Sequence, residues 1–508
     1  MESAQIMVVP FHGQGHVFPC VELCKRLAAR GVSVTIIADP SIALSLKQTA
    51  KEAHKSLGLT IGVIELEEDE KEDFEESGPP FMDHLSKPME DILQGLPSLP
   101  LCIIGDVMVP WVNSVCNNLA IPRVSFMTSG ACSMAFEYAM WKHSAQMEEA
   151  NVPFAVPGFP ESMTVSPSDA RHGPPNGPPP DGGERGAPPG HRGRGPPGHR
   201  GGGPPGHRGR GRGHRPPPPP PPPGGHGSDR QPPWMDGFKE CTGGLVNTCR
   251  ELEGPFLEYV IKETQKPAWA VGPLLPSSFW EESPGFVTHD SSVRKSRKSN
   301  IDEEQCMQWL DAQAPGSVLY VSFGSEVGPS DLEWTELALG LESAGKSFIL
   351  VLQAGEEEEE EEDVLPEGFE GRVEGRGLVV RGWAPQLLIL SHPATGGFLT
   401  HCGWNSTVES LGRGVAMLAW PIRGDQHYNA KLLVRELQVA AMIEVDAESG
   451  VVKSDSVAKG VKILMESEDG VKMREKAKAV KASLKSSLAS SLKELDAFID
   501  HILHMPKQ

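Results

Sequence analysis

The sequence predicts an α/β protein with two domains, each built on a parallel sheet that carries helices on both faces. The chain opens with an apolar strand at 6–9, a loop, a helix that extends to Arg30 and a second strand at 32–38. Much later, a strand at 397–400 again runs through a glycine-containing turn into a helix. Strands that alternate with helices favour parallel sheets. With 508 residues, the chain is long enough for two domains of ordinary size and additional sequence.

The loop after the first strand has part of a dinucleotide-binding pattern. Gly13 and Gly15 stand two positions apart, and Asp39 follows the second strand. That pattern needs a third glycine where the helix approaches the strand, and Phe18 occupies this place. The sequence therefore disfavours an NAD-type site.

The same loop offers two candidates for a general base, His12 and His16. A neutral imidazole titrates near working pH and can remove a proton from a hydroxyl group. A nearby carboxylate would fix the tautomer and favour the imidazolium that forms. Asp106 ends the apolar run 101–105 and is a candidate for this carboxylate, although an Asp after a strand is more often a helix N-cap.

The segment 377–426 is the most informative part of the chain. It predicts a strand at 377–382, a short helix through Leu390, the strand at 397–400, a helix and a strand at 416–420. A strand, a turn and a helix in this order direct backbone N–H groups and a positive helix end at a phosphate.

Two alternatives for Ser406 and Glu409 stay open at this point, since their spacing is also that of a capping box that needs no ligand. The neighbouring side chains favour a ligand. Trp383 offers an aromatic face, His401 suits a phosphate, and an acid and an amide at 425 and 426 can together hold several hydroxyls of a sugar ring.

Residues 383–426 as a whole resemble the signature box of plant-type UDP-dependent glycosyltransferases, which act on small molecules. The strand and loop at 317–325 resemble the family's first donor-domain strand and phosphate loop, and 244–253 and 269–274 resemble its approach to the interdomain linker. The resemblance covers most of the chain and implies the GT-B fold, in which two Rossmann-like domains with parallel sheets face each other across a cleft.

The resemblance also implies roles for single residues. Trp383 would stack on uracil, with the backbone at Ala384 and with Gln386 at its edge, and Glu409 would hold the ribose hydroxyls. The remaining donor contacts would be Ser325, His401, Asn405 and Ser406 at the diphosphate, and Trp404, Asp425 and Gln426 at the sugar. UDP-glucose is the expected donor, as a co-substrate and not a cofactor.

In the family the base aligns with the second histidine of the first loop, here His16, and its partner with Asp106. The implied reaction is the attack of an acceptor hydroxyl on the anomeric carbon with inversion and loss of UDP. The acceptor is expected to be a small lipophilic molecule such as a flavonoid, another phenolic or a terpenoid.

The expected domains are an acceptor-binding domain at 1–270, a linker at 271–300, a UDP-sugar-binding domain at 301–485 and a C-terminal helix at 486–508 that packs back on the first domain. A Pro/Gly/Arg insert at 170–233 interrupts the acceptor-binding domain. Residues 171–230 hold 19 Pro and 19 Gly with no Val, Ile, Leu, Phe or Met, so the insert is expected to be disordered.

Composition limits the partners. The net charge of −21 argues against general affinity for nucleic acids, with the arginines of the insert as the exception. The nine cysteines form no C-x-x-C pattern and therefore suggest free thiols in a reducing compartment and no zinc site. The chain shows no targeting segment and no long apolar run, so a cytoplasmic protein without a membrane span is expected. A monomer that needs no metal is also expected. The acidic runs 65–76 and 356–363 are expected to be solvated loops.

A second function from another class stays open. The chain could be a catalytically weak scaffold that binds a nucleotide sugar and recruits partners through the Arg-Gly and polyproline insert. The presence of both His16 and Asp106 disfavours this alternative.

Overall fold

The computed structural model describes residues 5–66, 83–144, 152–166, 169, 231–232, 234–281, 299–352 and 364–505. The acidic run 356–363, all but the first two residues of the run 65–76, and all of the insert 170–233 except 231–232 lie outside these residues. The expected disorder of the insert and the expected solvation of the acidic runs therefore stay predictions.

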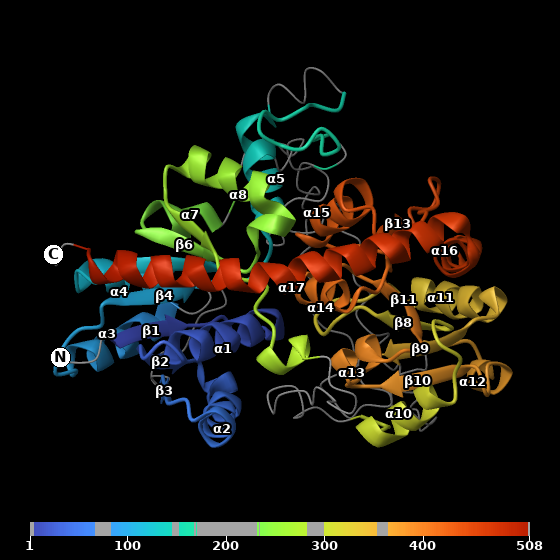
Figure 1. The fold of residues 1–508 in the computed structure, drawn as a ribbon, viewed down its shortest axis with the longest axis horizontal. Helices are drawn as coiled ribbons and strands as arrows, with labels where there is room; N and C mark the ends of the chain where they lie inside the picture. The colour runs from blue at the N-terminus through green and yellow to red at the C-terminus, as the bar shows by residue number, and fades with distance from the viewer. Residues whose placement is uncertain are drawn as a thin grey trace, which may run out of the picture.

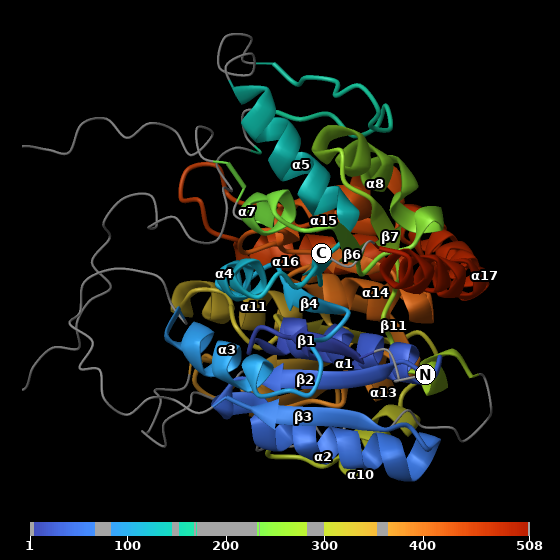
Figure 2. The ribbon, with the colours of Figure 1, turned by 90° about the vertical axis from the view of Figure 1, so that its left-hand side faces the viewer.

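The first half of the chain forms a sheet of seven parallel strands in the order β3-β2-β1-β4-β5-β6-β7. The strands are β1 (Gln5–Val9), β2 (Ser33–Ala38), β3 (Ile61–Glu65), β4 (Cys102–Asp106), β5 (Arg123–Met127), β6 (Gly243–Val246) and β7 (Ala268–Ala270). In Figure 2 the strands β4, β1, β2 and β3 lie side by side from top to bottom, with α2 below them and α5 and α8 above.

Helices cover both faces of the first sheet. They are α1 (Gln14–Ala28), α2 (Pro40–Leu57), α3 (Ser86–Gln94), α4 (Val112–Asn118), α5 (Ala131–Lys142), α7 (Trp234–Lys239) and α8 (Arg250–Thr264). The apolar residues of α1 and α2 pack with one set of strand side chains, and those of α3 and α4 pack with the other set. This division follows from the alternation of side chains along a strand.

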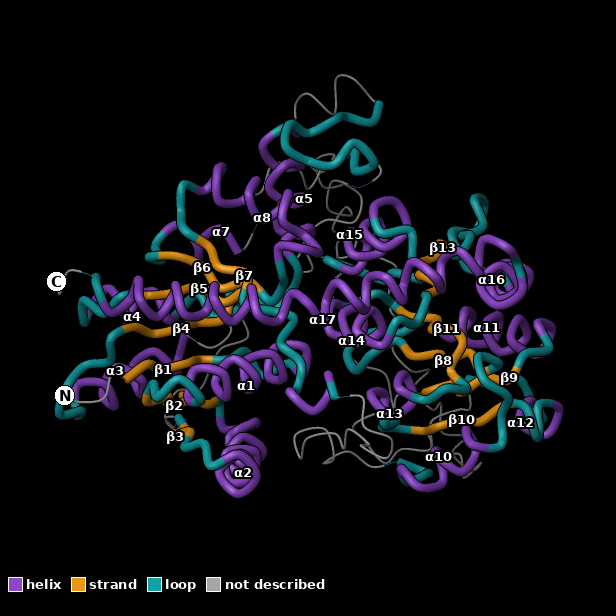
Figure 3. Tube along the Cα trace, in the orientation of Figure 1, coloured by secondary structure: helices purple, strands orange, loops and turns teal. Residues whose placement is uncertain are grey.

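The second half forms a sheet of six parallel strands in the order β10-β9-β8-β11-β12-β13. The strands are β8 (Val318–Ser322), β9 (Ser347–Leu352), β10 (Gly377–Arg381), β11 (Thr395–Thr400), β12 (Met417–Ala419) and β13 (Ala440–Met442). The helices are α10 (Glu303–Asp311), α11 (Asp331–Ala344), α12 (Phe369–Arg372), α13 (Gln386–Ser391), α14 (Trp404–Arg413), α15 (Gln426–Lys431) and α16 (Ser454–Glu466). Figure 3 shows the strands gathered in two separate groups. The predicted pair of parallel sheets is confirmed.

Local sequence signals explain several helix ends. The Asp39 carboxylate accepts from the Ser41 N–H at 2.8 Å and so caps α2, which ends at Gly58 in the left-handed conformation (φ 68°). Asp39 is therefore a helix cap, in agreement with the sequence argument against a dinucleotide site. Capping boxes begin α10 at Asp302 and α11 at Ser330.

One long helix, α17 (Glu468–Leu503), connects the two halves (Figure 1). It begins beside α16 and α14 and ends on the first sheet, where Leu495, Phe498 and Ile502 join the core shared with α1 and α2. The sequence analysis expected the C-terminal helix to begin at 486, after a domain that ends at 485. The structure instead has 36 continuous helical residues, because the Lys-, Ala-, Ser- and Leu-rich stretch on either side of this boundary holds no proline or glycine.

The strand order determines where polar side chains converge. In each sheet the order reverses beside the first strand, between β1 and β4 in one and between β8 and β11 in the other. Loops after strands on opposite sides of such a point diverge and leave room for a ligand at the carboxyl ends of the strands. The loop of His16 follows β1 and Asp106 ends β4, while Ser325 follows β8 and His401 follows β11.

Among the residues that the structure describes, none of the helices combines the length and the apolar character that a membrane-crossing helix requires.

Candidate active site

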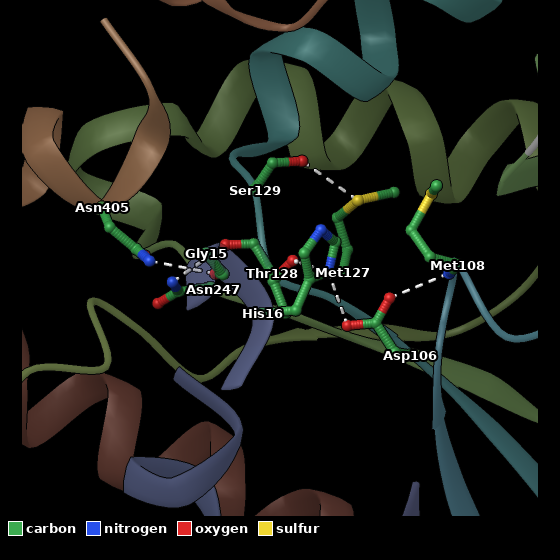
Figure 4. A network of polar contacts seen from close by, with 9 residues as sticks. All are labelled: Gly15, His16, Asp106, Met108, Met127, Thr128, Ser129, Asn247 and Asn405. Atoms are coloured by element: carbon green, nitrogen blue, oxygen red, sulfur yellow. Dashed lines mark hydrogen bonds and ion pairs between the residues drawn. The ribbon is translucent and has the colours of Figure 1, made fainter. Parts of the chain in front are cut away.

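His16 and Asp106 form a hydrogen-bonded pair at the switch point of the first sheet (Figure 4). His16 lies in the first turn of α1, and its Nδ1 is 2.8 Å from Oδ2 of Asp106, which is only 1% exposed. The other carboxylate oxygen accepts from the Met108 N–H at 2.8 Å. The Thr128 hydroxyl also lies 3.0 Å from His16 Nδ1. These contacts fix the plane of the imidazole.

Electrostatics around His16 favour its protonated form. Burial by itself lowers the pKa of His16, but the carboxylate of Asp106, with smaller contributions from Glu326 and Asp425, outweighs burial, and the net pKa is raised. A neutral His16 that donates from Nδ1 to Asp106 carries its lone pair on Nε2. This is the nitrogen that could accept a proton.

His12, the rival base, has a different environment. Its ring lies 4.2 Å from the ring of Phe11, and Phe11 in turn contacts His16 edge-on at 5.1 Å. The Asp106 carboxylate lies 2.8 Å from the Nδ1 of His16. The geometry therefore favours His16 over His12 as a base.

At the second sheet, His401 is buried beside two glycines. It follows β11 and is 8% exposed, its Nδ1 is buried, and the backbone of Ser322 lies close to its imidazole. A Cβ atom on Gly324 would lie 2.8 Å from His401 Nε2, and one on Gly403 would overlap the same nitrogen. Burial lowers the pKa of His401 to about 4. His401 is therefore a neutral hydrogen-bonding group at neutral pH, and the exposed Ser325 lies on the neighbouring loop after β8.

The helix that follows His401 begins earlier than a capping box at Ser406 requires. Helix α14 begins at Trp404 with Gly403 as its N-cap, so Ser406 already lies inside the first turn. The capping-box alternative for Ser406 and Glu409 is therefore wrong. The first N–H groups of any helix have no partner within the helix. The N-cap residue Gly403 has no side chain that could accept from these donors, which lie at the carboxyl end of the second sheet.

Three residues predicted to contact the nucleotide lie in contact with one another. The side-chain amide of Gln386 donates to Ser406 Oγ at 3.1 Å and to the Glu409 carboxylate at 2.7 Å, and its oxygen accepts from the Tyr320 hydroxyl at 3.2 Å. Glu409 is 1% exposed. Gln386 therefore holds the Glu409 carboxylate in place in this structure.

Trp404 and Asn405, both predicted donor contacts, direct their side chains to the first half of the chain. The Trp404 indole N–H donates to the Asn247 carbonyl at 2.7 Å, and the Asn405 amide donates to the Gly15 carbonyl at 3.0 Å. Any contact of Trp404 with a sugar would have to use its backbone N–H, since the indole donor is already paired.

Asp425 and Gln426 lie at the start of α15. The Gln426 side-chain oxygen accepts the backbone N–H groups of Ile422 and Arg423 at 2.9 and 3.0 Å, which leaves its amide hydrogens as donors. Asp425 Oδ2 accepts from Asn429 at 3.0 Å. Burial and, less strongly, Glu326 raise the pKa of Asp425, whereas Asn429 and His16 oppose the shift.

Two of the three residues predicted at the uracil, Trp383 and Ala384, directly follow β10. Trp383 is half-buried and Ala384 is 8% exposed, and the Ala384 carbonyl accepts from the Gln386 N–H at 2.8 Å. The backbone at Ala384 is thus held in a turn beside the aromatic ring.

The sequence analysis missed four residues of the site. Thr128 and Asn247 each follow an apolar strand, β5 and β6, and this position is a signal that could have found them. Glu326 follows Ser325, and its carboxylate would lie 2.9 Å from a Cβ atom on Gly13. The fourth is Glu253. No signal in the sequence indicates that Glu326 and Glu253 belong to the site.

Glu253 is a completely buried carboxylate that caps α5. Its two oxygens accept from the N–H groups of Ala131 and Cys132 at 2.9 and 2.8 Å. Burial raises its pKa to about 7, although the two N–H donors and Thr248 oppose the shift. Because α5 begins three residues after Thr128, this cap fixes the segment that contacts His16.

Two observations concern cysteine and metal chemistry. All nine cysteines are buried and free. Within the described ranges, His, Cys, Asp and Glu side chains form no group of three or more that could hold a metal ion.

Comparisons with known proteins agree with this geometry. The family model for UDP-glucoronosyl and UDP-glucosyl transferase matches residues 293–473. UDP-glycosyltransferase 73D1 of Arabidopsis thaliana is 30% identical over 495 residues, which cover 91% of this chain and 86% of that protein. Anthocyanin 3'-O-beta-glucosyltransferase of Gentiana triflora is 29% identical over 541 residues and both chains are covered completely.

A solved structure, that of Phytolacca americana UGT2 complexed with UDP-2fluoro-glucose and pterostilbene, shares 26% identity and has a TM-score of 0.69. The similarity covers 99% of this chain and 99% of that one. This likeness and the two parallel sheets confirm the predicted GT-B fold. The chain therefore belongs to the family of plant UDP-glycosyltransferases and is a transferase enzyme.

Proposed function

We propose that this enzyme transfers glucose from UDP-glucose to a hydroxyl of a small phenolic or terpenoid acceptor, with inversion at the anomeric carbon. The single observation that carries the proposal is the His16–Asp106 pair, 2.8 Å apart, on the sheet that faces the nucleotide-binding signature. Glucose is supported by the relatives, since one is a glucosyltransferase by name and another was solved with UDP-2fluoro-glucose. The anthocyanin in the name of one relative and the pterostilbene bound in the structure of the other support a phenolic acceptor.

The diphosphate would lie between the loop of Ser325, His401 and the first turn of α14. The buried imidazole of His401 and the overlap of a Cβ atom on Gly324 with this ring support this placement. The N–H groups of Asn405 and Ser406 lie in the first turn, where the helix dipole favours an anion. We propose that these groups stabilise the leaving diphosphate and that no metal is needed.

The nucleoside would lie against Trp383, with Ala384 and Gln386 at the edge of the base and Glu409 at the ribose. The half-exposed ring and the bond from Gln386 to Glu409 support this part of the proposal. The sugar would contact Asp425 and Gln426, because each retains hydrogen-bonding capacity beyond its internal bonds.

The charged groups around His16 favour the proton transfer that the reaction needs. As the acceptor hydroxyl attacks, its proton would move to Nε2, and the imidazole would become an imidazolium. Asp106, Glu326 and Asp425 each raise the pKa of His16 and so favour this charged form. Asp106 would remain ionised and hold the ring.

The proposed division of the chain is the one expected from its sequence, with the acceptor bound by residues 1–270 and the donor by residues 301–485. We also propose a monomer in the cytosol. Nine buried free thiols support a reducing compartment.

The test is the release of UDP from UDP-glucose in the presence of a panel of phenolic and terpenoid acceptors. Asp425→Ala should lower kcat/KM for UDP-glucose by at least about a hundredfold, because it removes a charged hydrogen-bond acceptor from the sugar. Asp311→Ala is the control, since this aspartate is in the same half and is 72% exposed. Full turnover in Asp425→Ala would contradict the proposed sugar site, and no release with any acceptor would favour a nucleotide-sugar scaffold.

Deletion of residues 171–230, with a short Gly-Ser linker in their place, should leave turnover within about twofold of the wild type, as expected for a loop insertion. The deletion keeps Asp169, whose carboxylate pairs with Lys431 at 2.7 Å. A scaffold that recruits partners through the insert would lose its function. Loss of turnover with intact UDP binding would instead assign the insert to acceptor binding.

A further inference from the structure

The indole of Trp404 crosses from the donor half into the first half of the chain. It is 4% exposed, and its N–H donates to the carbonyl of Asn247 at 2.7 Å. The far edge of the ring lies against Gly130, where a Cβ atom would come within 2.8 Å of Cη2. An apolar ring would fill this space equally well, but only an N–H donor can also pair with the buried carbonyl.

Asn247, which receives this bond, is 1% exposed and is fixed on three further sides. Its backbone N–H donates to the Met127 carbonyl at 2.9 Å, and its side-chain amide donates to the Thr128 carbonyl at 3.0 Å. Its side-chain oxygen accepts from the Leu274 N–H at 2.8 Å. Asn247 therefore joins Trp404 to the segment that ends β5.

Thr128 completes a chain of contacts to His16, because its hydroxyl lies 3.0 Å from the imidazole Nδ1 (Figure 4). A second contact reaches the first turn of α1, which holds His16, from the next residue of α14. Asn405 donates to the carbonyl of Gly15, the residue before His16, at 3.0 Å. The first two residues of α14 are thus both linked to His16. Trp404 is linked to it through Asn247 and Thr128, and Asn405 through the adjacent Gly15.

We infer that Trp404 is a positioning residue for the transfer step, which acts on His16 through Asn247 and Thr128. The inference rests on the proposed function of His16 as the base. The donor lies at the first turn of α14 and the base lies on the other sheet, so the distance between the base and the anomeric carbon depends on how the two halves are held together. Hydrogen bonds of fixed length between α14 and the His16 segment set this distance.

The experiment is a double-mutant cycle on kcat with Trp404→Phe and Thr128→Val. The first variant removes the indole N–H and keeps an aromatic ring, and the second removes only the hydroxyl. Each should lower kcat about tenfold, since a displacement of a base by a fraction of an ångström reduces turnover. The Kd for UDP should change by less than about twofold, because neither donor group binds the nucleotide in this proposal.

The double variant decides between a connected path and two separate defects. If the path is connected, the double variant should have about the same kcat as the less active single variant. If the two defects are independent, the double variant should lose about a hundredfold in kcat. Trp269→Phe is the matched control, since Trp269 is 9% exposed and packs on Phe498 of α17. Additive losses, unchanged kcat in the single variants, or an equal loss in Trp269→Phe would overturn the inference.

His16→Ala separates this inference from the proposed function. If His16→Ala keeps wild-type turnover, the proposed base is wrong and the path has no target. If His16→Ala abolishes turnover while the cycle is additive, the base stands and only the positioning role of Trp404 fails.

Discussion

Replacing His16 with alanine should lower kcat by about a thousandfold, which is the contribution of a well-placed general base. The variant loses the only group that this proposal gives for removing the proton of the acceptor. Binding of UDP should persist, because His16 lies in α1 beside the first sheet and the nucleotide signature belongs to the second sheet and its helices. UDP release with a phenolic acceptor, and titration calorimetry with UDP, measure the two effects separately.

The pH dependence of kcat/KM tests the roles of His16 and Asp106 independently. The base must be neutral, so activity should fall as the pH drops through the raised pKa of His16. Asp106 is the largest of the groups that raise this pKa, although burial lowers it. Asp106→Asn should therefore move the acidic limb of the profile to lower pH while it reduces kcat. A limb that stays in place, or moves to higher pH, would refute the assignment of Asp106 as the partner of His16.

His12→Ala is the matched control for this loop. Its imidazole lies on Phe11, and the carboxylate contact of Asp106 is made with His16. If His12→Ala loses as much activity as His16→Ala, the base has been assigned to the wrong histidine.

Glu253→Ala should reduce the free energy of unfolding by about 2–4 kcal/mol, because it leaves two buried N–H donors without a partner. These are the N–H groups of Ala131 and Cys132, at the start of α5. The loss should also lower kcat, because α5 follows the Thr128 segment that contacts His16. Urea unfolding followed by tryptophan fluorescence measures the stability.

The buried carboxylate of Glu253 also predicts a pH dependence of stability. Burial raises its pKa from 4.5 to about 7, so the folded state binds this proton more tightly than the unfolded state. The stabilisation is fully present below pH 4.5 and is lost as the pH rises to about 7. In Glu253→Gln, which cannot titrate, this contribution should be absent from the same window.

Glu251→Ala is the control for these variants, since Glu251 lies two residues away on α8 and is exposed. Its stability and pH profile should match the wild type. A stable Glu253→Ala with normal turnover would show that the α5 cap is dispensable.

The sequence predicted the two sheets because their strands are apolar, short and separated by helices with clear ends. The loop of His16, Asp106 at the end of a strand, and His401 after another strand could also be located, because each follows a strand whose end is visible in the hydrophobic pattern. The assignment of a nucleotide sugar came from resemblance across 383–426, since no single residue there specifies uracil or glucose.

Other features could not be predicted, because they depend on contacts between residues far apart in sequence. The spacing of Ser406 and Glu409 matched a capping box, but α14 begins at Trp404 and Glu409 bonds to Gln386. A local pattern cannot decide between a helix cap and a partner on another helix, because both satisfy the same hydrogen-bonding groups.

The sequence by itself determined the class of fold and the approximate places of several strands, and it offered His12, His16 and Asp106 as candidates for a base and its partner. Only the tertiary structure decided which histidine meets Asp106 and that Trp404 and Asn405 reach across to the first half of the chain. The physical reason is that the pattern of apolar residues along a strand reflects burial, which is local and periodic in the sequence. The direction of a hydrogen bond between two sheets depends on how they are packed together, and no short stretch of sequence records that packing.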